Sequence, residues 1–361
     1  MIRLARPLLD AEEEAAVARV LRSGQLVQGA EVAAFEEGLA AVTGRRHAVA
    51  VGSGTVALEL ALEALGVDGG DVLCPALSWP SPAHAILRAG ARPVLVDVDP
   101  SSWNSTAEAF GAARTDDCRA AIVIDQLGLP SDHSAIAAAL GDLPILLDAA
   151  CSLGSAVDGR PAAAFGRIAT TSFHPRKVLT TGEGGACFTD DPRLAERLRV
   201  LRNHGQAGRG AFPEAGTNAR LTEVAAALGR VQLERLEAMV ARRRALAARY
   251  RAGLPPRLRC QSGRDGLESN VQTFGVVLPP GTSVDARDRT LDGLRARGVE
   301  GGRLSYALSR LPSLRPAAPP PCPVAEDLED RGLALPMHPG MADDDVDRVV
   351  EALGAVAGGP A

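Results

Sequence analysis

The stretch 170–185, TTSFHPRKVLTTGEGG, places Lys177 between a β-branched and aromatic run that predicts a strand end and a turn rich in glycine. A lysine amine is a nucleophile only when it is neutral, and a cramped, partly desolvated turn with a cationic neighbour such as Arg176 favours the neutral form. The glycines let the backbone approach a ligand closely, and Thr171 and Ser172 offer hydroxyl groups to an anion. From these residues alone, Schiff-base chemistry at Lys177 and a plain surface lysine on a glycine turn are both open interpretations.

A second ligand-binding pattern lies nearer the N-terminus. The sequence HAVAV at 47–51 predicts a short strand, which runs directly into Gly-Ser-Gly-Thr at 52–55 and then into an apolar helical pattern. A strand that ends at a helix start presents unpaired backbone N–H groups to an anion. The pattern therefore predicts a phosphate cradle, although on its own it is equally a plain helix start with Thr55 in the first turn.

Strand and helix patterns alternate through the first half of the chain. Apolar strand patterns at 71–77, 92–99, 118–124 and 144–150 are separated by helical patterns at 81–90 and 132–141. Such alternation predicts an α/β fold with a mostly parallel central sheet, covered by helices on both faces, that binds ligands at the carboxyl ends of its strands. Asp148 closes one of these strands, and the predicted strands 168–172 and 186–189 bracket the lysine turn.

The rest of the chain predicts a smaller second domain. A long helix over 222–252 bridges to it, and the composition changes after residue 254. Beyond that point we expect a strand over 270–278, a helix over 285–297, a proline-rich connector over 311–323 and a helix over 342–356. The predicted division is a large domain, 1–253, and a small C-terminal α+β domain, 254–361.

Composition excludes several classes of function. The chain has 361 residues and a net charge of -5, so it carries no basic footprint for nucleic acid. No apolar run reaches the roughly 18 residues of a membrane span, and no signal-peptide pattern opens the chain, so we expect a cytoplasmic protein. Six cysteines without a CxxC pair and six histidines without HxxxH spacing predict neither a disulfide frame nor a metal site.

Several ordered motifs together resemble one family. The sequence SFHPRKVLTTGEGG at 172–185 is similar to the lysine loop of the DegT-like sugar aminotransferases, which are pyridoxal-phosphate (PLP) enzymes of fold type I. The resemblance extends nearly end to end, through 23–36, 51–62, 76–79, 89–100, 146–155, 201–206, 216–237 and 333–341. It implies fold type I, with the first few residues of the chain joining the small domain.

The resemblance assigns two catalytic residues. Lys177 would form the Schiff base with PLP and then move a proton, and Asp148 would keep the pyridine nitrogen protonated. Ser53, Gly54, Thr55 and Ser172 would bind the phosphate through N–H groups and hydroxyls. Without the family, Asp148 would be interpreted as a strand-terminal helix cap.

Two further positions match cofactor contacts of the family. Trp79, in the sequence ALSW, would stack on the pyridine face, whereas a lone tryptophan is more often a core residue. Asn218, in GTNAR, would reach the cofactor phosphate of the neighbouring subunit of a homodimer, whereas alone it would be interpreted as a turn residue. The active sites are therefore expected to be shared between two chains.

Other positions depart from the commonest family pattern. Cys151 stands where relatives usually carry His or Gln near the cofactor's phenolic oxygen, and Thr217 stands where an aromatic residue usually follows the glycine. Gln25 and Val27 differ in the SGxLxxG segment, and the segment 301–314 matches the substrate-facing loop only loosely. These positions surround the substrate, so the resemblance supports the cofactor more firmly than the substrate.

The function predicted is a PLP-dependent aminotransferase that moves an amino group from glutamate or glutamine to a keto sugar, nucleotide-linked, or to a keto cyclitol, in sugar or secondary-metabolite biosynthesis. Two alternatives stay open: PLP chemistry other than transamination, and a regulatory protein that binds PLP without turnover. A minority of the family are dehydratases with histidine in place of the lysine, and the presence of Lys177 argues against that branch.

Overall fold

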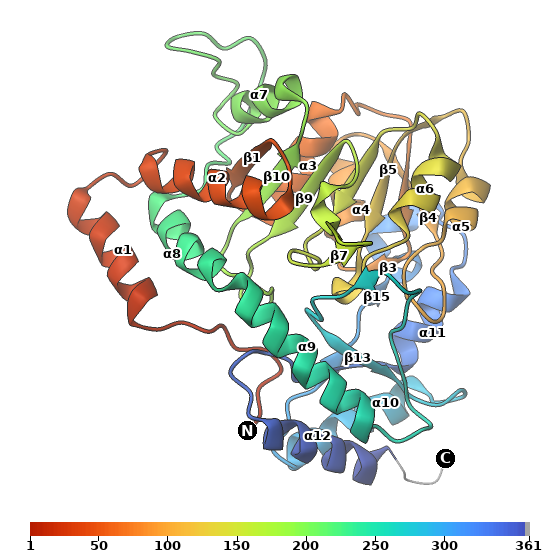
Figure 1. Ribbon diagram of the computed structural model, residues 1–361. Coiled ribbons are helices and arrows are strands. Elements are labelled where there is room, and N and C mark those ends of the chain that lie inside the picture. Colours follow the sequence, from red (N-terminus) through yellow and green to blue (C-terminus); the bar gives the residue numbers. More distant parts are fainter. Residues whose placement is uncertain (358–361) are drawn as a thin grey trace.

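The central sheet has seven strands, in the order β1-β10-β9-β6-β5-β2-β4, in the computed structural model, which describes residues 1–357 (Figure 1). The strands are β1 (His47–Val51), β2 (Asp71–Pro75), β4 (Arg92–Val96), β5 (Cys118–Ile124), β6 (Ile145–Asp148), β9 (Ile168–Ser172) and β10 (Gly185–Thr189). The five neighbouring strands from β9 to β4 are parallel, whereas β10 is antiparallel to both β1 and β9. The predicted α/β fold with a mostly parallel sheet is confirmed.

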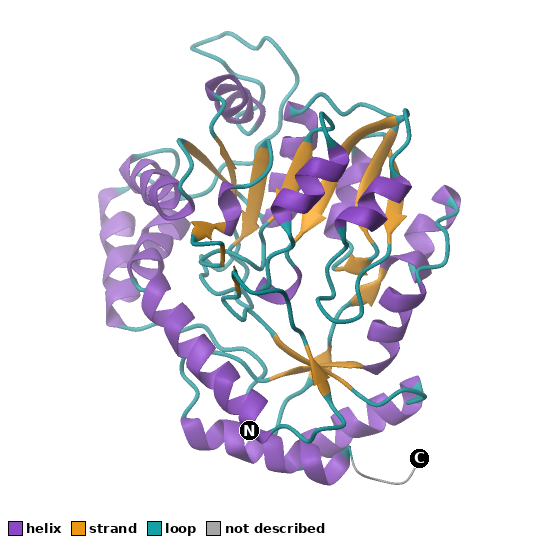
Figure 2. Cartoon of the chain, turned by 45° about the vertical axis from the view of Figure 1, so that its right-hand side comes forward, coloured by secondary structure: helices purple, strands orange, loops and turns teal. Residues whose placement is uncertain are grey.

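Helices cover both faces of this sheet (Figure 2). The helices are α2 (Ala30–Thr43), α3 (Gly54–Ala64), α4 (Ser81–Arg88), α5 (Ala107–Ala113), α6 (His133–Leu140) and α7 (Pro192–Leu201). In β5, Ile122 packs into the core formed with α3 and α4, whereas Val123 packs into the core formed with α2, α5 and α6. Because strand residues of both parities are apolar, both faces must be removed from water.

The predicted helix over 222–252 is divided into two helices, α8 (Glu223–Glu234) and α9 (Leu236–Gly253). Arg235 stands at the junction, with φ of -97° and ψ of -2°. Its guanidinium pairs with Asp10 at 2.8 Å and with Glu12 at 2.5 Å, at the start of α1 (Ala11–Ser23). The helix is therefore divided at the residue whose side chain binds the acidic start of a distant helix.

A second, four-stranded antiparallel sheet has the order β11-β13-β16-β14. Its strands are β11 (Arg259–Cys260), β13 (Phe274–Val277), β14 (Gly302–Arg303) and β16 (Gly332–Leu335), accompanied by α10 (Val284–Ala296), α11 (Pro323–Arg331) and α12 (Asp343–Val356). Ile2 joins its core, and the Ile2 N–H bonds to the Gly298 carbonyl at 2.7 Å. The predicted boundary after residue 253 coincides with the end of α9; the two-domain division stays a prediction, and its last residues, 358–361, lie outside the described part.

Short strands connect these layers. β3 (Leu77–Ser78) pairs with β15 (Tyr306–Ala307), and β7 (Ala156–Val157) pairs with both β8 (Arg160–Pro161) and β12 (Leu267–Glu268). The predicted proline-rich connector contains a 3-10 helix, Pro312–Ala317. Between residues 1 and 357, no helix combines the length and the apolar character that crossing a membrane requires.

Candidate active site

The lysine turn connects β9 to β10, and its backbone is tied at both ends to Phe173. The Phe173 carbonyl accepts hydrogen bonds from the Thr181 N–H at 3.0 Å and from the Thr180 hydroxyl at 2.8 Å. The Phe173 N–H donates to the Gly184 carbonyl at 2.9 Å, and its ring is fully buried. A buried aromatic anchor therefore fixes the loop that carries Lys177.

Lys177 is the only lysine in the chain. Its Nζ donates a hydrogen bond to Cys151 Sγ at 3.3 Å. Cys151 lies in the turn that follows β6, three residues after Asp148. The structure thus brings together Lys177 and Cys151, two site residues predicted from segments far apart in the sequence.

Asp148 is buried at the carboxyl end of β6, and one carboxylate oxygen accepts a hydrogen bond from the Ala150 N–H at 3.0 Å. Burial raises the pKa of Asp148 above its ordinary value, and the Ala150 N–H and the charge of Lys177 oppose that rise. A cation placed against this carboxylate would oppose the rise further and favour the ionised form. A protonated pyridine nitrogen is such a cation.

The predicted phosphate cradle lies where α3, β9 and β10 meet. Ser53 caps α3, its hydroxyl accepting from the Val56 N–H at 3.2 Å. A Cβ on Gly54 would stand 2.7 Å from Ser172 Cβ, so only glycine allows this approach. Thr55 reaches the neighbouring helix, with its Oγ1 2.9 Å from the Ser81 hydroxyl. Residues 53–55 and Ser172 are therefore adjacent.

These groups fit PLP. A phosphate takes hydroxyl and backbone N–H donors at the positive end of a helix, which α3 and Ser172 supply. The aldehyde carbon of PLP reacts with a primary amine, which Lys177 supplies. The protonated pyridine nitrogen pairs with a buried carboxylate, which Asp148 supplies. Lys177, Asp148 and the cradle are the residues of this chain that would hold the three parts of the cofactor.

Trp79 is 61% exposed, so the interpretation of this residue as core is wrong. Its ring packs edge-on against Tyr306, with centroids 5.4 Å apart. Tyr306 reaches this place because β15 pairs with β3 directly before Trp79. The sequence reasoning missed Tyr306; an isolated aromatic residue in the loosely matching segment 301–314 was the available sign.

Asn218 is exposed and lies beside the cradle, not inside it. The next residue, Ala219, accepts a hydrogen bond from the Gly52 N–H at 2.9 Å through its carbonyl. Among the side-chain hydrogen bonds within residues 1–357, none involves Asn218. Thr217 is also exposed, and its carbonyl accepts from the His204 N–H at 3.0 Å.

The segment containing Gln25 and Val27 lies against the start of α8. Gln25 Nε2 donates to the Val27 carbonyl at 2.9 Å, and Val27 forms a β-bridge with Thr222. Glu223, the next residue, accepts hydrogen bonds at 2.9 Å from backbone N–H groups at the start of α2. Gln25 and Val27 are therefore exposed residues beside the start of α8.

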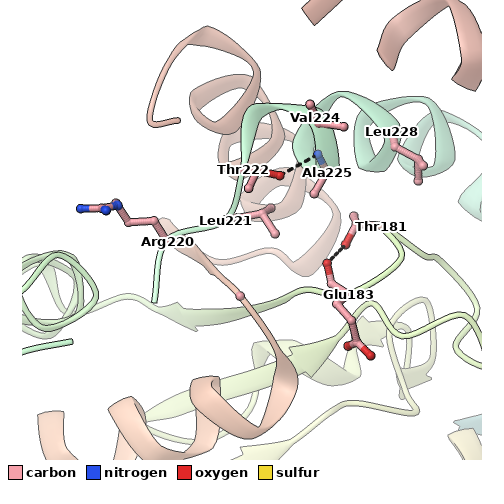
Figure 3. A pocket seen from close by; sticks show the side chains of 9 residues that line it. Thr181, Glu183, Arg220, Leu221, Thr222, Val224, Ala225 and Leu228 are labelled. Carbon is pink, nitrogen blue, oxygen red and sulfur yellow. Dashed lines mark hydrogen bonds between the residues drawn. The ribbon is translucent and has the colours of Figure 1, made fainter. Parts of the chain in front are cut away.

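A pocket of about 360 Å³ lies between the lysine turn and α8 (Figure 3). Thr181 and Glu183 line it from the turn, and Thr222, Val224 and Leu228 line it from α8. It borders the site through Gly52 but does not include Lys177, so it is a neighbouring feature and not the catalytic cavity.

Two polar residues that the sequence reasoning missed clamp the site from the segment before β13. Asn270 Nδ2 donates to the carbonyls of Cys151 and Leu153, each at 2.8 Å. Gln272 Nε2 donates to the Arg176 carbonyl at 2.7 Å. Nothing in the local pattern at 270–272 indicates these contacts, because their partners are about a hundred residues away.

Comparisons with known proteins identify the family of this chain. The model of the DegT/DnrJ/EryC1/StrS aminotransferase family matches residues 7–354. The chain is 34% identical to the aminotransferase TlmJ from Streptoalloteichus hindustanus, with 99% of this chain and 98% of that chain covered and a TM-score of 0.92. It is 33% identical to DesI, solved in the presence of its TDP-sugar product, with 99% and 92% covered and a TM-score of 0.91.

The same fold occurs in Spr1654 from Streptococcus pneumoniae, which has been solved in a PLP form. That protein is 24% identical, with 98% of this chain and 97% of that chain covered and a TM-score of 0.91. The family model spans almost the entire chain, and the residues that fit PLP lie within the matched range. The chain therefore belongs to the DegT/DnrJ/EryC1/StrS aminotransferase family and is a PLP-dependent aminotransferase.

Proposed function

We propose that the enzyme moves an amino group from glutamate or glutamine to a keto group on a sugar, nucleotide-linked, or on a cyclitol, in sugar or secondary-metabolite biosynthesis. The observation that carries the proposal is the placement of the chain's only lysine beside Cys151, in a loop that adjoins Asp148 and the cradle. The likeness to DesI, which was solved with its TDP-sugar product, supports the nucleotide-linked sugar.

PLP, when bound, supplies a carbonyl group that condenses with amines and a protonated ring that accepts electrons from the substrate's α-carbon. The carboxylate of Asp148 would hold the proton on the ring nitrogen. Lys177 Nζ would hold the cofactor through its carbonyl group and would serve as the base for the proton of the donor's α-carbon. Ser53, Gly54, Thr55 and Ser172 would hold the phosphate.

Aromatic residues would cover the exposed side of this site. Trp79 would stack on the ring, and Tyr306, which packs edge-on against the indole with centroids 5.4 Å apart, would hold it in place. Cys151, whose Sγ lies 3.3 Å from Lys177 Nζ, would face the cofactor's phenolic oxygen, where its thiol would take the place of the usual His or Gln. These residues orient the ring and take no proton in the reaction.

The proposed working unit is a homodimer with shared active sites. Asn218 is exposed yet lies next to Gly52 at the entrance of the cradle. Exposed apolar side chains, Leu26 and Val27, lie near the pocket beside α8. Burial of such side chains against a second copy would place each Asn218 toward the partner's phosphate.

The experiment that tests the function is a substrate panel. The protein, loaded with PLP, is incubated with keto sugars, nucleotide-linked keto sugars and keto cyclitols, with glutamate or glutamine labelled with ¹⁵N in the transferred nitrogen. Mass spectrometry should find the label in an acceptor, and the Lys177→Ala variant should transfer none. An acceptor changed without label would indicate chemistry other than transamination. No conversion across the panel would favour a PLP-binding regulatory protein.

A second measurement tests the cofactor link directly. Borohydride reduction of the yellow protein should leave the cofactor on Lys177 in a peptide map. Because the chain has no other lysine, the α-amino group of Met1 is the matched control amine. Cofactor on Met1, or on neither, would contradict the assignment.

A further inference from the structure

A second aspartate, Asp125, lies directly beside Asp148. β5 and β6 are parallel neighbours, and Ile124 pairs in register with Asp148. Asp125 follows Ile124, and its N–H bonds to the Asp148 carbonyl at 3.4 Å. Its side chain is 0% exposed. Two carboxylates are thus buried at adjacent strand ends of the same site.

The carboxylate of Asp125 has three hydrogen-bond donors. Oδ1 accepts from the Ser131 N–H at 2.8 Å and lies 2.9 Å from His133 Nε2, while Oδ2 accepts from the Ser152 hydroxyl at 2.7 Å. His133 is itself buried, and its ring stacks on Phe165 with centroids 4.3 Å apart and planes 6° apart. A buried carboxylate is stable only when it is hydrogen-bonded and its charge is balanced.

Asp125 is connected through Ser152 to the turn after β6, which contains Cys151. Ser152 follows Cys151, the residue that contacts Lys177 Nζ. Asp125 and Asn270 both bind this turn, Asp125 through the Ser152 hydroxyl and Asn270 through the Cys151 carbonyl. The position of Cys151 relative to Asp148 depends on both anchors.

The charge of Asp125 also acts on Asp148. Burial is the main cause of the raised pKa of Asp148, and the negative charge of Asp125 adds to it. An unbalanced Asp125 would therefore oppose the ionised Asp148 that the reaction needs. A cation on the far side of Asp125 would cancel this effect.

We propose that His133 is the cation that balances Asp125, and that the pair positions the Asp148–Ser152 turn while leaving Asp148 free to carry the negative charge of the site. Neither residue touches the reacting atoms, so both are positioning residues. The inference rests on the proposed role of Asp148 toward the pyridine nitrogen.

Other charged groups near the pair do not replace it. Asp132 is next to His133 in sequence, but its carboxylate binds Arg264 at 2.8 Å. At Asp148, the neighbouring groups are Lys177, whose charge opposes the rise in the Asp148 pKa, and Cys74, where burial raises the pKa of the thiol. Asp125 is thus the buried anion that His133 faces.

The test is a double-mutant cycle read by pH. Wild type, His133→Gln, Asp125→Asn and the double variant are loaded with PLP, and both the cofactor's absorption and kcat/KM are followed against pH. His133→Gln keeps a hydrogen-bond donor for Asp125 but removes the cation. The charge of Asp125 then raises the pKa of Asp148 further, so the acidic limb of the kcat/KM profile should move up by about one pH unit. Adding Asp125→Asn should return the limb to the wild-type position, because no charge is then left unbalanced.

If the acidic limb of the pH profile in His133→Gln stayed at the wild-type position, His133 would not balance the charge of Asp125. The same conclusion would follow if the shift remained in the double variant. Ser152→Ala removes the link without changing charge, so kcat should fall about tenfold with the limb unmoved; an unchanged kcat would overturn the positioning role. Asp71→Asn, at a buried aspartate that begins β2 at the amino ends of the parallel strands, is the control and should leave the limb in place. Asp148→Asn distinguishes a failure of the proposed role of Asp148 from a failure of the role of the Asp125–His133 pair. A wild-type cofactor spectrum in Asp148→Asn would refute the role of Asp148 itself.

Discussion

Lys177 Nζ donates a hydrogen bond to Cys151 Sγ at 3.3 Å, so the chain's only lysine contacts the residue that departs from the commonest family pattern after Asp148. The thiol sulfur is a weak hydrogen-bond acceptor, so it orients the amine without preventing the amine from reacting with the cofactor. The contact explains how a smaller side chain can occupy this position and still orient the catalytic group.

Cys151→Ser should therefore change the absorption or titration of the bound cofactor modestly and retain turnover, with kcat within about tenfold of wild type, because one hydrogen bond is exchanged for another. Absorption spectra and steady-state rates measure both effects. Cys260→Ser, a half-buried cysteine in β11, is the matched control. Complete loss of activity in a folded, PLP-loaded Cys151→Ser variant would point to a nonstandard mechanism.

Gly54→Ala should weaken PLP binding about tenfold or more. The added Cβ would stand 2.7 Å from Ser172 Cβ, so the start of α3 and the end of β9 must separate, which costs about 1–3 kcal/mol. Fluorescence titration of the unloaded protein with PLP measures the affinity.

Gly111→Ala is the control for that substitution. Its added Cβ would lie 3.8 Å from Ala139 Cβ, an ordinary van der Waals contact between α5 and α6, so affinity should not change. If Gly54→Ala and Gly111→Ala bound PLP with equal affinity, the assignment of residues 53–55 to the phosphate site would be wrong.

Asp148→Asn should leave the fold intact but slow the half-reaction with the amino donor by on the order of a hundredfold or more. Without its charge partner, the pyridine nitrogen loses its proton and the ring accepts electrons poorly. Stopped-flow absorption of the loaded enzyme mixed with glutamate measures the rate. A near-normal rate would assign the role to another group.

The same substitution should stabilise the unloaded protein at neutral pH. Because burial raises the pKa of Asp148 above 3.8, the folded chain keeps a proton that the unfolded chain loses as the pH rises. The stabilising contribution of Asp148 is complete below pH 3.8 and is lost as the pH rises through the raised pKa. Thermal denaturation should show the advantage of Asp148→Asn above that window and its disappearance in acid; an advantage that grows in acid would contradict this.

Mixing Lys177→Ala with Asn218→Ala should restore activity if the sites are shared. In a mixed dimer, one site would then carry both defects and the other none, so activity should exceed that of either parent. Subunit exchange is checked by native mass spectrometry. If exchange occurs and no activity returns, both residues serve the same chain's site and Asn218 is an ordinary turn residue.

Local sequence patterns determined much of the fold. The predicted strand 47–51 coincides with β1, because an apolar run that ends at a glycine needs little context to be recognised. Asp148 was placed at a strand end for the same reason. The residues around Lys177 predicted the lysine turn, and the sequence also shows that Lys177 is the only lysine of the chain.

Tertiary structure alone decided how these pieces support one another. The division between α8 and α9 falls at Arg235, whose side chain pairs with Asp10 and Glu12 at the start of α1, although the local pattern favours one continuous helix. Asn270 reaches Cys151, and His133 reaches Asp125, only after the strands have paired. Tyr306 packs against Trp79 only because β15 pairs with β3. Short-range propensity and hydrophobic periodicity are written in neighbouring residues, whereas a buried polar contact depends on which distant groups share the same low-dielectric space and can satisfy one another's hydrogen bonds and charge.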